Sequence, residues 1–450
     1  MFKKALAISM AFIGLIVGAG FASGQEALQY FVAFGTDGIW GAVLASVFMT
    51  ITGIAVLQLG SYYQATEHTA VLGRISSRVT SWILDIATVI TLFCIGFVMF
   101  AGGGANLQQQ FGLPTWIGAT IMLVLVLLTG MLDVDKVSTV IGAITPFVIV
   151  FIVGATVWTL VTSNPDWTTL DLASSAVVTS LPNWWLAALN YVGLSIMTAV
   201  SMAIVIGGAN LDTRAAGLGG LIGGFFFLLM LMLLVLALFV SVSTVGQEDM
   251  PVLALINGIH PVLGVIMTFV VFGMIFNTAI GMFYALGKRL TRGNPARFRP
   301  VFIVACLIGF GLSFFGFRDL VSYVYPVLGY MGILMLVVIS VAWIRGREKV
   351  STEGRRRLRA RVLLARKLDP RKRYTRKNQR ELQRLVKESN VPDKKFIEAL
   401  EEDMTSELLA DDEIDYDPED PPVNLVYVEH TKPVGPDEQP AAEAPEAKPE

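Results

Sequence analysis

A glycine-rich stretch inside the first apolar run is the strongest candidate for chemistry in this sequence. Its residues are Gly18-Ala19-Gly20-Phe21-Ala22-Ser23-Gly24-Gln25-Glu26. Three of the first seven are glycine, and each glycine weakens a helix by about 1 kcal/mol relative to alanine. We therefore expect the helix of the first apolar run to be interrupted in this stretch. Inside a membrane, a break frees carbonyl groups that can coordinate a cation and exposes a helix N-terminus that suits an anion.

Glu26 ends this stretch, and the mostly apolar residues 27–34 follow it. An acidic side chain at that depth is expensive and must face protein, an ion or water. Irregular backbone in a membrane is tolerated where it lines a cavity or is buried in protein. Two interpretations follow: a solute cavity with Glu26 as its coupling residue, or a glycine-rich packing face with Glu26 in a structural hydrogen bond.

A second interruption is predicted in the sixth apolar run. Residues 190–201 place Asn190, Ser195 and Thr198 in the middle of that run. Discontinuities in corresponding helices of two halves are a sequence signal for a transporter binding site. We therefore expect these three side chains to join the first stretch in one site. Serine and threonine can instead bond back to their own helix.

Two further polar positions lie in apolar runs. Asn277 and Thr278 are adjacent in the eighth run, where their side-chain oxygens suit either a small cation or a helix–helix contact. Asp85 lies near the start of the third run, where compensation of the helix dipole explains it, so it is left out of the site.

The composition indicates that the helices carrying these residues lie in a membrane. The chain has 450 residues, of which 54% are hydrophobic and 16% are charged, and its mean hydropathy is +0.63. Soluble domains rarely reach that value, because their surfaces must carry charge. A helix needs about 20 apolar residues to cross a bilayer core of about 30 Å. Ten runs meet or approach this length: 5–34, 38–63, 81–105, 114–132, 137–162, 184–208, 216–243, 261–287, 299–316 and 320–344.

Positive charges orient these ten runs. With the N-terminus in the cytoplasm, the outer loops receive Arg318 alone. The inner side receives Lys3, Lys4, Arg74, Arg78, Lys136, Arg214, Lys288, Arg289, Arg292, Arg297 and Arg299. Cytoplasmic loops carry an excess of Lys and Arg, so a multi-pass protein of the cell membrane with both termini in the cytoplasm is predicted. Residues 1–4 before an apolar run resemble a signal peptide, but the run continues to Phe34, which favours an uncleaved first helix.

Two segments outside the ten runs have their own patterns. Residues 250–260 are apolar but too short to span, and predict either a cap helix over an outer vestibule or a simple amphipathic loop helix. The remainder, 346–450, is a charged tail in two parts. Residues 346–400 are basic and suit anionic lipid at the inner leaflet, with nucleic acid the weaker alternative. Residues 401–450 are acidic and proline-rich and predict disorder, and no protein partner of the tail can be named.

Several functional classes are not supported by any motif. The two cysteines, Cys94 and Cys306, lie inside apolar runs, and the three histidines are scattered without metal-site spacing. No phosphate loop, nucleophile elbow or HExxH motif occurs. Neither an enzyme nor a resident cofactor is expected, apart from Na⁺ or H⁺ as a coupling ion.

The stretch from Val17 to Glu26, followed by Phe34-Gly35, resembles the YkvI-type bacterial membrane proteins. These are similar to the amino acid–polyamine–cation transporter superfamily, which has the LeuT fold. Over residues 1–345 the resemblance implies an all-α protein with inverted five-helix repeats and alternating access. It also implies a site between helices one, three, six and eight. By this analogy Ala19, Ala22, Asn277 and Thr278 would hold sodium, whereas Glu26 could instead carry a proton, since removal from water favours a neutral carboxyl.

The sequence thus supports two hypotheses. The first is a secondary transporter that carries a small organic solute, such as an amino acid, together with Na⁺ or H⁺. Its substrate-binding candidates are Gly18, Gly20, Phe21, Ser23, Gly24, Gln25, Glu26, Asn190, Ser195 and Thr198. The second is a membrane-anchored regulatory or scaffolding protein that presents its cytoplasmic tail.

Overall fold

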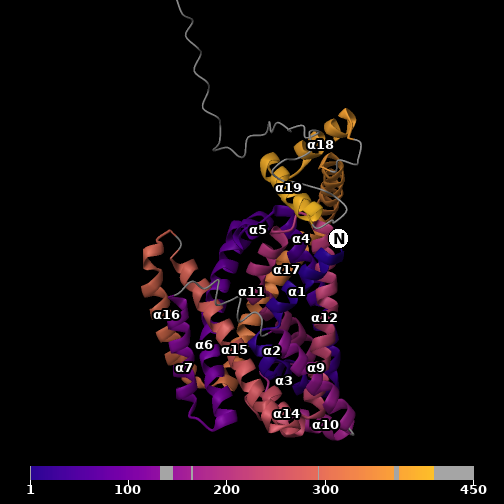
Figure 1. Ribbon diagram of the computed structural model, residues 1–450. Helices are drawn as coiled ribbons and strands as arrows, with labels where there is room; N and C mark the ends of the chain where they lie inside the picture. Colours follow the sequence, from indigo (N-terminus) through magenta and orange to yellow (C-terminus); the bar gives the residue numbers. More distant parts are fainter. Residues whose placement is uncertain (1, 132–144, 164–165, 292, 369–373, 410–450) are drawn as a thin grey trace, which may run out of the picture.

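The computed structural model describes residues 2–131, 145–163, 166–291, 293–368 and 374–409 as an assembly of helices, with no strand among them (Figure 1). Within these described ranges, seven stretches are long and apolar enough to cross a membrane. They are Gln25–Tyr63, α6 (Arg78–Phe111), α11 (Trp184–Gly208), α12 (Thr213–Val240), α15 (Pro261–Leu290), Phe298–Phe315 and α17 (Phe317–Leu368). Two apolar helices, α7 (Thr115–Gly130) and α9 (Thr145–Thr162), are shorter. The start of the predicted span 137–162 lies outside the described residues, and the count of ten spans stays a prediction.

The first span is divided into three short helices, which confirms the predicted break. They are α1 (Phe2–Ile16), α2 (Ala19–Ser23) and α3 (Gln25–Tyr30). Gly18 is extended between α1 and α2. Gly24 separates α2 from α3 with a φ of 83°, a left-handed conformation that glycine adopts without steric cost. A 3-10 turn, η1 (Val32–Phe34), then leads into α4 (Gly35–Tyr63).

The break predicted in the sixth span is wrong, because α11 is continuous from Trp184 to Gly208. Its polar side chains are satisfied without opening the helix. Ser195 Oγ donates to the Tyr191 carbonyl at 2.9 Å, and Thr198 Oγ1 donates to the Ser195 carbonyl at 2.8 Å. Gly193, in the middle of α11, allows close packing, since a Cβ there would collide with the backbone of α17.

The helices of the body pack into one apolar core. Helix α12 packs against α4 and α1, α11 packs against α4 and α17, and α15 packs against α6. Short helices cover the two ends: α5 (His68–Ile75) at one, and α10 (Trp167–Ser174) and α14 (Pro251–Ile259) at the other (Figure 1). We call these ends the tail side and the α14 side. The helix predicted at 250–260 is α14, and its apolar face is buried against the body.

The charged tail is folded where the structure describes it. Helix α17 continues from the body without a break to Leu368, and α18 (Arg376–Glu388) and α19 (Asp393–Leu409) pack beside its end (Figure 1). Their shared core consists of Ala360, Leu363, Leu364, Leu368, Leu382, Val386, Val391, Phe396, Ile397, Leu400, Met404 and Leu408. Disorder predicted from residue 401 is therefore wrong for 401–409, because Leu400, Met404 and Leu408 form one apolar helix face. The predicted disorder of 410–450 lies outside the described residues.

Candidate functional site

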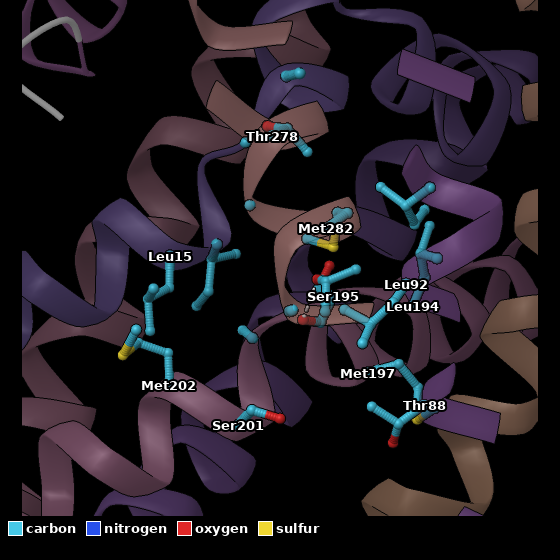
Figure 2. Close-up of a pocket in the computed structure, with 18 of the residues that line it drawn as sticks. Leu15, Thr88, Leu92, Leu194, Ser195, Met197, Ser201, Met202, Thr278 and Met282 are labelled. Atoms are coloured by element: carbon cyan, nitrogen blue, oxygen red, sulfur yellow. Dashed lines mark hydrogen bonds between the residues drawn. The ribbon is translucent and has the colours of Figure 1, made fainter. Parts of the chain in front are cut away.

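A cavity of about 690 Å³ lies beside the break in the first span. Its walls come from α1, α2, α3, α5, α6, α11, α15 and α17. Figure 2 shows Leu15, Ser195, Thr278 and Met282 around this space, contributed by α1, α11 and α15. The volume is in the range of about 300–1,000 Å³ that is typical of sites for small molecules. The geometry therefore favours the cavity interpretation of the break.

Glu26 reaches this cavity from the first turn of α3. Its carboxyl group lies directly against Gly20, where an added Cβ would occupy the position of the carboxyl atoms. Gly24 allows the Glu26 side chain to lie back against α2, because its left-handed conformation changes the direction of the chain between α2 and α3. Among the hydrogen bonds and ion pairs of the described residues, none involves Glu26. The carboxyl group is therefore available to a solute, an ion or a proton.

The main chain at the break also offers unpaired polar groups. The Gly18 N–H donates to the Ile16 carbonyl at 2.9 Å, which turns the chain out of α1. Within the described backbone, no hydrogen bond reaches the carbonyl oxygens of Leu15 and Val17 or the N–H of Ala19. All three residues line the cavity. This is the irregular backbone at a cavity wall that membrane proteins use to coordinate ions.

The four residues expected to hold sodium are only partly brought together. Ala19, Asn277 and Thr278 line the cavity, whereas Ala22 is buried and does not. Helix α2 packs on α15, and Thr278 Oγ1 donates to the Met274 carbonyl at 3.0 Å, which leaves its lone pairs able to accept. No group of three metal-ligating His, Cys, Asp or Glu side chains exists in the described part of the chain. Ala19, Asn277 and Thr278 offer neutral oxygens to the cavity, and the Glu26 carboxyl group borders the same space.

The predicted substrate-binding residues divide into two groups. Those that line the cavity are Gly18, Gly20, Phe21, Glu26, Ser195 and Thr198. Ser23, Gly24, Gln25 and Asn190 do not. Ser23 Oγ donates to the Gly20 carbonyl at 2.8 Å, and the Gln25 side chain is fully buried without a partner. Asn190 accepts from Tyr30 Oη at 3.1 Å and donates to the Pro326 carbonyl at 2.9 Å, so it joins α11 to α3 and α17.

Much of the apolar wall is made of residues that sequence reasoning missed. Five methionines line the cavity: Met99, Met197, Met202, Met274 and Met282. Tyr325 of α17 also contributes. Methionine in an apolar helix carries no functional signal by itself. The helical spacing of Met274, Thr278 and Met282 is the pattern that could have placed them on one face with a polar group.

The cavity extends to the tail side, where charged side chains form its mouth. Arg289 of α15 forms an ion pair with Asp85 of α6, and its Nη1 lies 2.8 Å from His68 Nε2 of α5. The Asp85 side chain is 47% exposed and lines the cavity, so the mouth reaches solvent. The helix dipole alone therefore does not explain Asp85. Its partner Arg289 is distant in the sequence and could not be identified from it.

The α14 side is closed by packing and by polar contacts. Val252 of α14 lies against Gly24, where a Cβ would collide with its side chain. Gln109 of α6 donates to the Met250 carbonyl at 3.0 Å and accepts from its N–H at 2.8 Å. Arg318 donates to the Gln247 side chain at 3.0 Å. The cavity thus communicates with one side of the body.

The tail is attached to the tail side of the body through a buried arginine. Arg357 is 2% exposed. Its guanidinium donates to the carbonyls of Ser61 and Tyr62 at the end of α4, both at 2.8 Å, and to the Leu211 carbonyl at 3.1 Å. Its Nε donates to Glu353 at 3.0 Å. The Ser61 and Tyr62 carbonyls belong to the last turn of α4, where carbonyls lack partners within the helix and favour a cation.

Comparisons with known proteins agree with this architecture. No protein-family model matches the chain. The uncharacterized membrane protein YkvI of Bacillus subtilis (strain 168) is 24% identical over 332 residues, which are 73% of this chain and 93% of YkvI. The uncharacterized protein YyaD of the same organism is 24% identical over 327 residues, with the same coverage. Part of this chain therefore has no counterpart in either relative.

A solved structure has the same fold. The crystal structure of MhsT in complex with L-phenylalanine aligns with a TM-score of 0.51 and 13% identity, over 75% of this chain and 87% of MhsT. The chain thus resembles the YkvI-type bacterial membrane proteins in sequence, and its helical body has the architecture of the LeuT-fold transporters.

Proposed function

We propose that this protein is a secondary active transporter that carries a small organic solute, such as an amino acid, in symport with Na⁺ or H⁺. The observation that carries the proposal is the cavity at the broken first span, with the Glu26 carboxyl group facing into it. A similarity in fold to a transporter that binds an amino acid supports a solute of this size.

The proposed mechanism is alternating access. The cavity opens to the tail side and is closed on the α14 side by α14 and the contacts of Gln109. A transporter must also adopt the reverse arrangement, in which α14 and the break separate while the tail-side mouth closes. The excess of Lys and Arg in the tail-side loops favours the cytoplasm for that side. This orientation places both termini inside the cell and makes the present conformation inward-facing.

Two ions are candidates for coupling. Sodium would use the unpaired carbonyls of Leu15 and Val17 with the oxygens of Asn277 and Thr278. A proton would use Glu26, whose carboxyl group has no partner among the described residues. Either ion would be carried by groups that border the same cavity, so occupancy by solute and ion could be linked.

The alternative is a membrane-anchored scaffold that presents its tail. The tail helices pack back onto the body through Arg357, which favours a tail that belongs to the transporter over one held out for partners. The exposed basic face of α18 suits anionic lipid, as the sequence predicts. Deletion of residues 351–450 separates the two hypotheses: a scaffold would lose its phenotype while solute binding stayed unchanged.

Thermal-shift measurements on the purified protein test the transport proposal. Amino acids and other small solutes are screened in sodium chloride and in choline chloride. A solute that binds stabilises the folded state by mass action. We expect stabilisation by a group of related solutes, and a dependence on sodium if sodium is the coupling ion. The absence of stabilisation by any solute would contradict the proposal.

A further inference from the structure

The charges around the cavity identify a class of solute, an inference that depends on the proposed function. Among the lining residues of α1, α2, α3, α11 and α17, Glu26 is the one charged side chain. The remaining groups there are apolar, or neutral hydroxyls such as Ser195 and Thr198. The deep part of the cavity therefore contains a carboxyl group and, within the described residues, no basic side chain.

The basic side chains of the cavity lie at its mouth and have other partners. Lys288 and Arg289 are ten or more residues beyond Thr278 along α15, a distance of about 15 Å at the rise of an α-helix. Arg289 is paired with Asp85 and His68. Lys288 lies over the rings of Tyr284 and Phe298, 5.4 Å from each centroid. Neither can neutralise an anionic group placed beside Glu26.

A solute carboxylate beside an ionised Glu26 would meet a full like charge, which the partial positive charge of the unpaired Ala19 N–H offsets only in part, whereas an ammonium group would meet an opposite charge. Like charges that share a low-dielectric site repel strongly, and an opposite charge within a few ångströms favours ionisation of both groups. The rings of Phe21 and Tyr325 in the same wall can add cation–π attraction.

The rest of the wall suits an apolar group of variable shape. Met99, Met197, Met202, Met274 and Met282 are flexible and polarizable, and such side chains adapt to different apolar groups. Leu92, Ile95 and Leu194 complete this surface. We propose that the preferred solute is an apolar organic amine that carries no carboxylate, with its ammonium group on Glu26 and its apolar part against the methionines.

Matched triplets of probes test this proposal on the full-length protein. The first triplet is 3-methylbutylamine, leucine and 4-methylpentanoate, which share a branched chain and differ in the amine and carboxylate. The second is 2-phenylethylamine, phenylalanine and 3-phenylpropanoate. In at least one triplet we expect the amine to bind at least tenfold more tightly than the amino acid, and the acid not to bind. Glu26→Gln should weaken amine binding at least tenfold, whereas Glu348→Gln, at an exposed carboxyl on α17, should leave it unchanged.

Three results would overturn the proposal: an amino acid that binds as tightly as its amine, stabilisation by neither amine, or unchanged amine binding in Glu26→Gln. Uptake into proteoliposomes separates this inference from the transport proposal. Preferential uptake of an amino acid would contradict the amine proposal and support transport. An amine that binds at Glu26 without being carried would support recognition and contradict transport.

A different observation concerns the tail. Lys4 in the first turns of α1 forms an ion pair with Asp403 of α19, which also forms an ion pair with Arg361, whose Nε lies 3.1 Å from Oδ2. Lys395 of α19 donates to the Gln64 carbonyl, at the end of α4, at 3.1 Å. Helix α1 contributes Gly14, Leu15 and Ile16 to the cavity wall. The tail thus connects α1, which forms part of the cavity wall, to the end of α4.

An interaction present in one conformation stabilises that conformation relative to others that lack it. The Lys4–Asp403 pair is made while the cavity is open to the tail side. We infer that α19 acts as a latch that holds α1 in the open position. Both side chains are partly exposed, at 34% and 26%, so the contribution is that of a surface ion pair and weakens with salt.

Thiol labelling measures this effect. Thr198→Cys, in a background where Cys94 and Cys306 are serine, places a reactive group in the cavity wall. Lys4→Gln should slow labelling from the tail side about two- to fivefold. Asp403→Asn should slow it as well, and Lys3→Gln, at an exposed neighbouring lysine, should not. Unchanged or faster labelling in Lys4→Gln would overturn the latch, as would an effect confined to Asp403→Asn, which would indicate a role within the tail alone.

Discussion

Gly20 presents its unsubstituted Cα to the carboxyl group of Glu26, six residues later in the chain. The contact joins the two short helices that follow the break in the first span, and it places the carboxyl group in the wall of the cavity. The glycines of this span therefore have different functions. Gly18 and Gly24 shape the backbone, whereas Gly20 leaves space for a charge.

Gly20→Ala should displace the Glu26 carboxyl group, because the new Cβ would take its position. We expect at least a tenfold loss of solute affinity with normal membrane insertion, measured by thermal shift and by expression. Gly311→Ala, in the stretch Phe298–Phe315, is the matched control, since a Cβ at Gly311 meets no atom within 4 Å and this residue does not line the cavity. Equal solute affinity in the two variants would contradict the assigned role of Gly20.

Arg357→Ala should detach the tail from the body. The substitution removes donors to Ser61 and Tyr62 and one of the two arginines paired with the buried Glu353, and loss of such buried partners costs about 3 kcal/mol. The expected result is rapid proteolysis within the tail while the body stays intact. Arg359→Ala removes an exposed ion pair to Glu381 and should have a much smaller effect, because solvent screens such pairs. Similar protease resistance in both variants would show that Arg357 does not hold the tail.

Attachment of the tail should weaken in acid because of Glu353. Burial raises the pKa of Glu353, but the hydrogen bond from Ser389 and the charges of Arg357 and Arg356 outweigh it, so the pKa lies below its ordinary value of 4.5. A carboxyl group with a lowered pKa stabilises the folded state above its ordinary pKa, and this contribution is lost as the pH falls through the folded value.

Proteolysis of the tail as a function of pH checks this prediction. The wild-type tail should be resistant at pH 7 and should become sensitive as the pH falls below 4.5. Glu353→Gln should be more sensitive at pH 7 and should show a smaller change with pH. An identical acid transition in both proteins would mean that another group controls it.

The sequence predicts the features that depend on backbone propensity and on charge. Gly18 and Gly24 interrupt the first span as expected, because glycine weakens a helix wherever it lies. Glu26 lines the cavity, in agreement with one of the two interpretations that the sequence leaves open for an acidic side chain in a membrane.

Features that depend on tertiary contacts were not predictable in the same way. Serine and threonine in the middle of an apolar run are compatible with a broken helix and with a continuous one. In α11 the side chains of Ser195 and Thr198 bond to carbonyls of the preceding turn, and the helix stays continuous. The Asn190 side chain is used by hydrogen bonds to Tyr30 and to the Pro326 carbonyl. Both partners are distant in the sequence, so these bonds could not be predicted from it. The folding of residues 401–409 depends on apolar partners in α17 and α18, which an acidic composition conceals.

The central claim is that Glu26 couples a solute in this cavity to an ion gradient. Uptake into proteoliposomes under an imposed sodium or proton gradient tests it most directly, with the solute that gives the largest thermal shift. We predict gradient-driven accumulation by the wild-type protein and by Glu348→Gln, and its loss in Glu26→Gln. Gradient-driven accumulation by Glu26→Gln at the wild-type rate would contradict the claim.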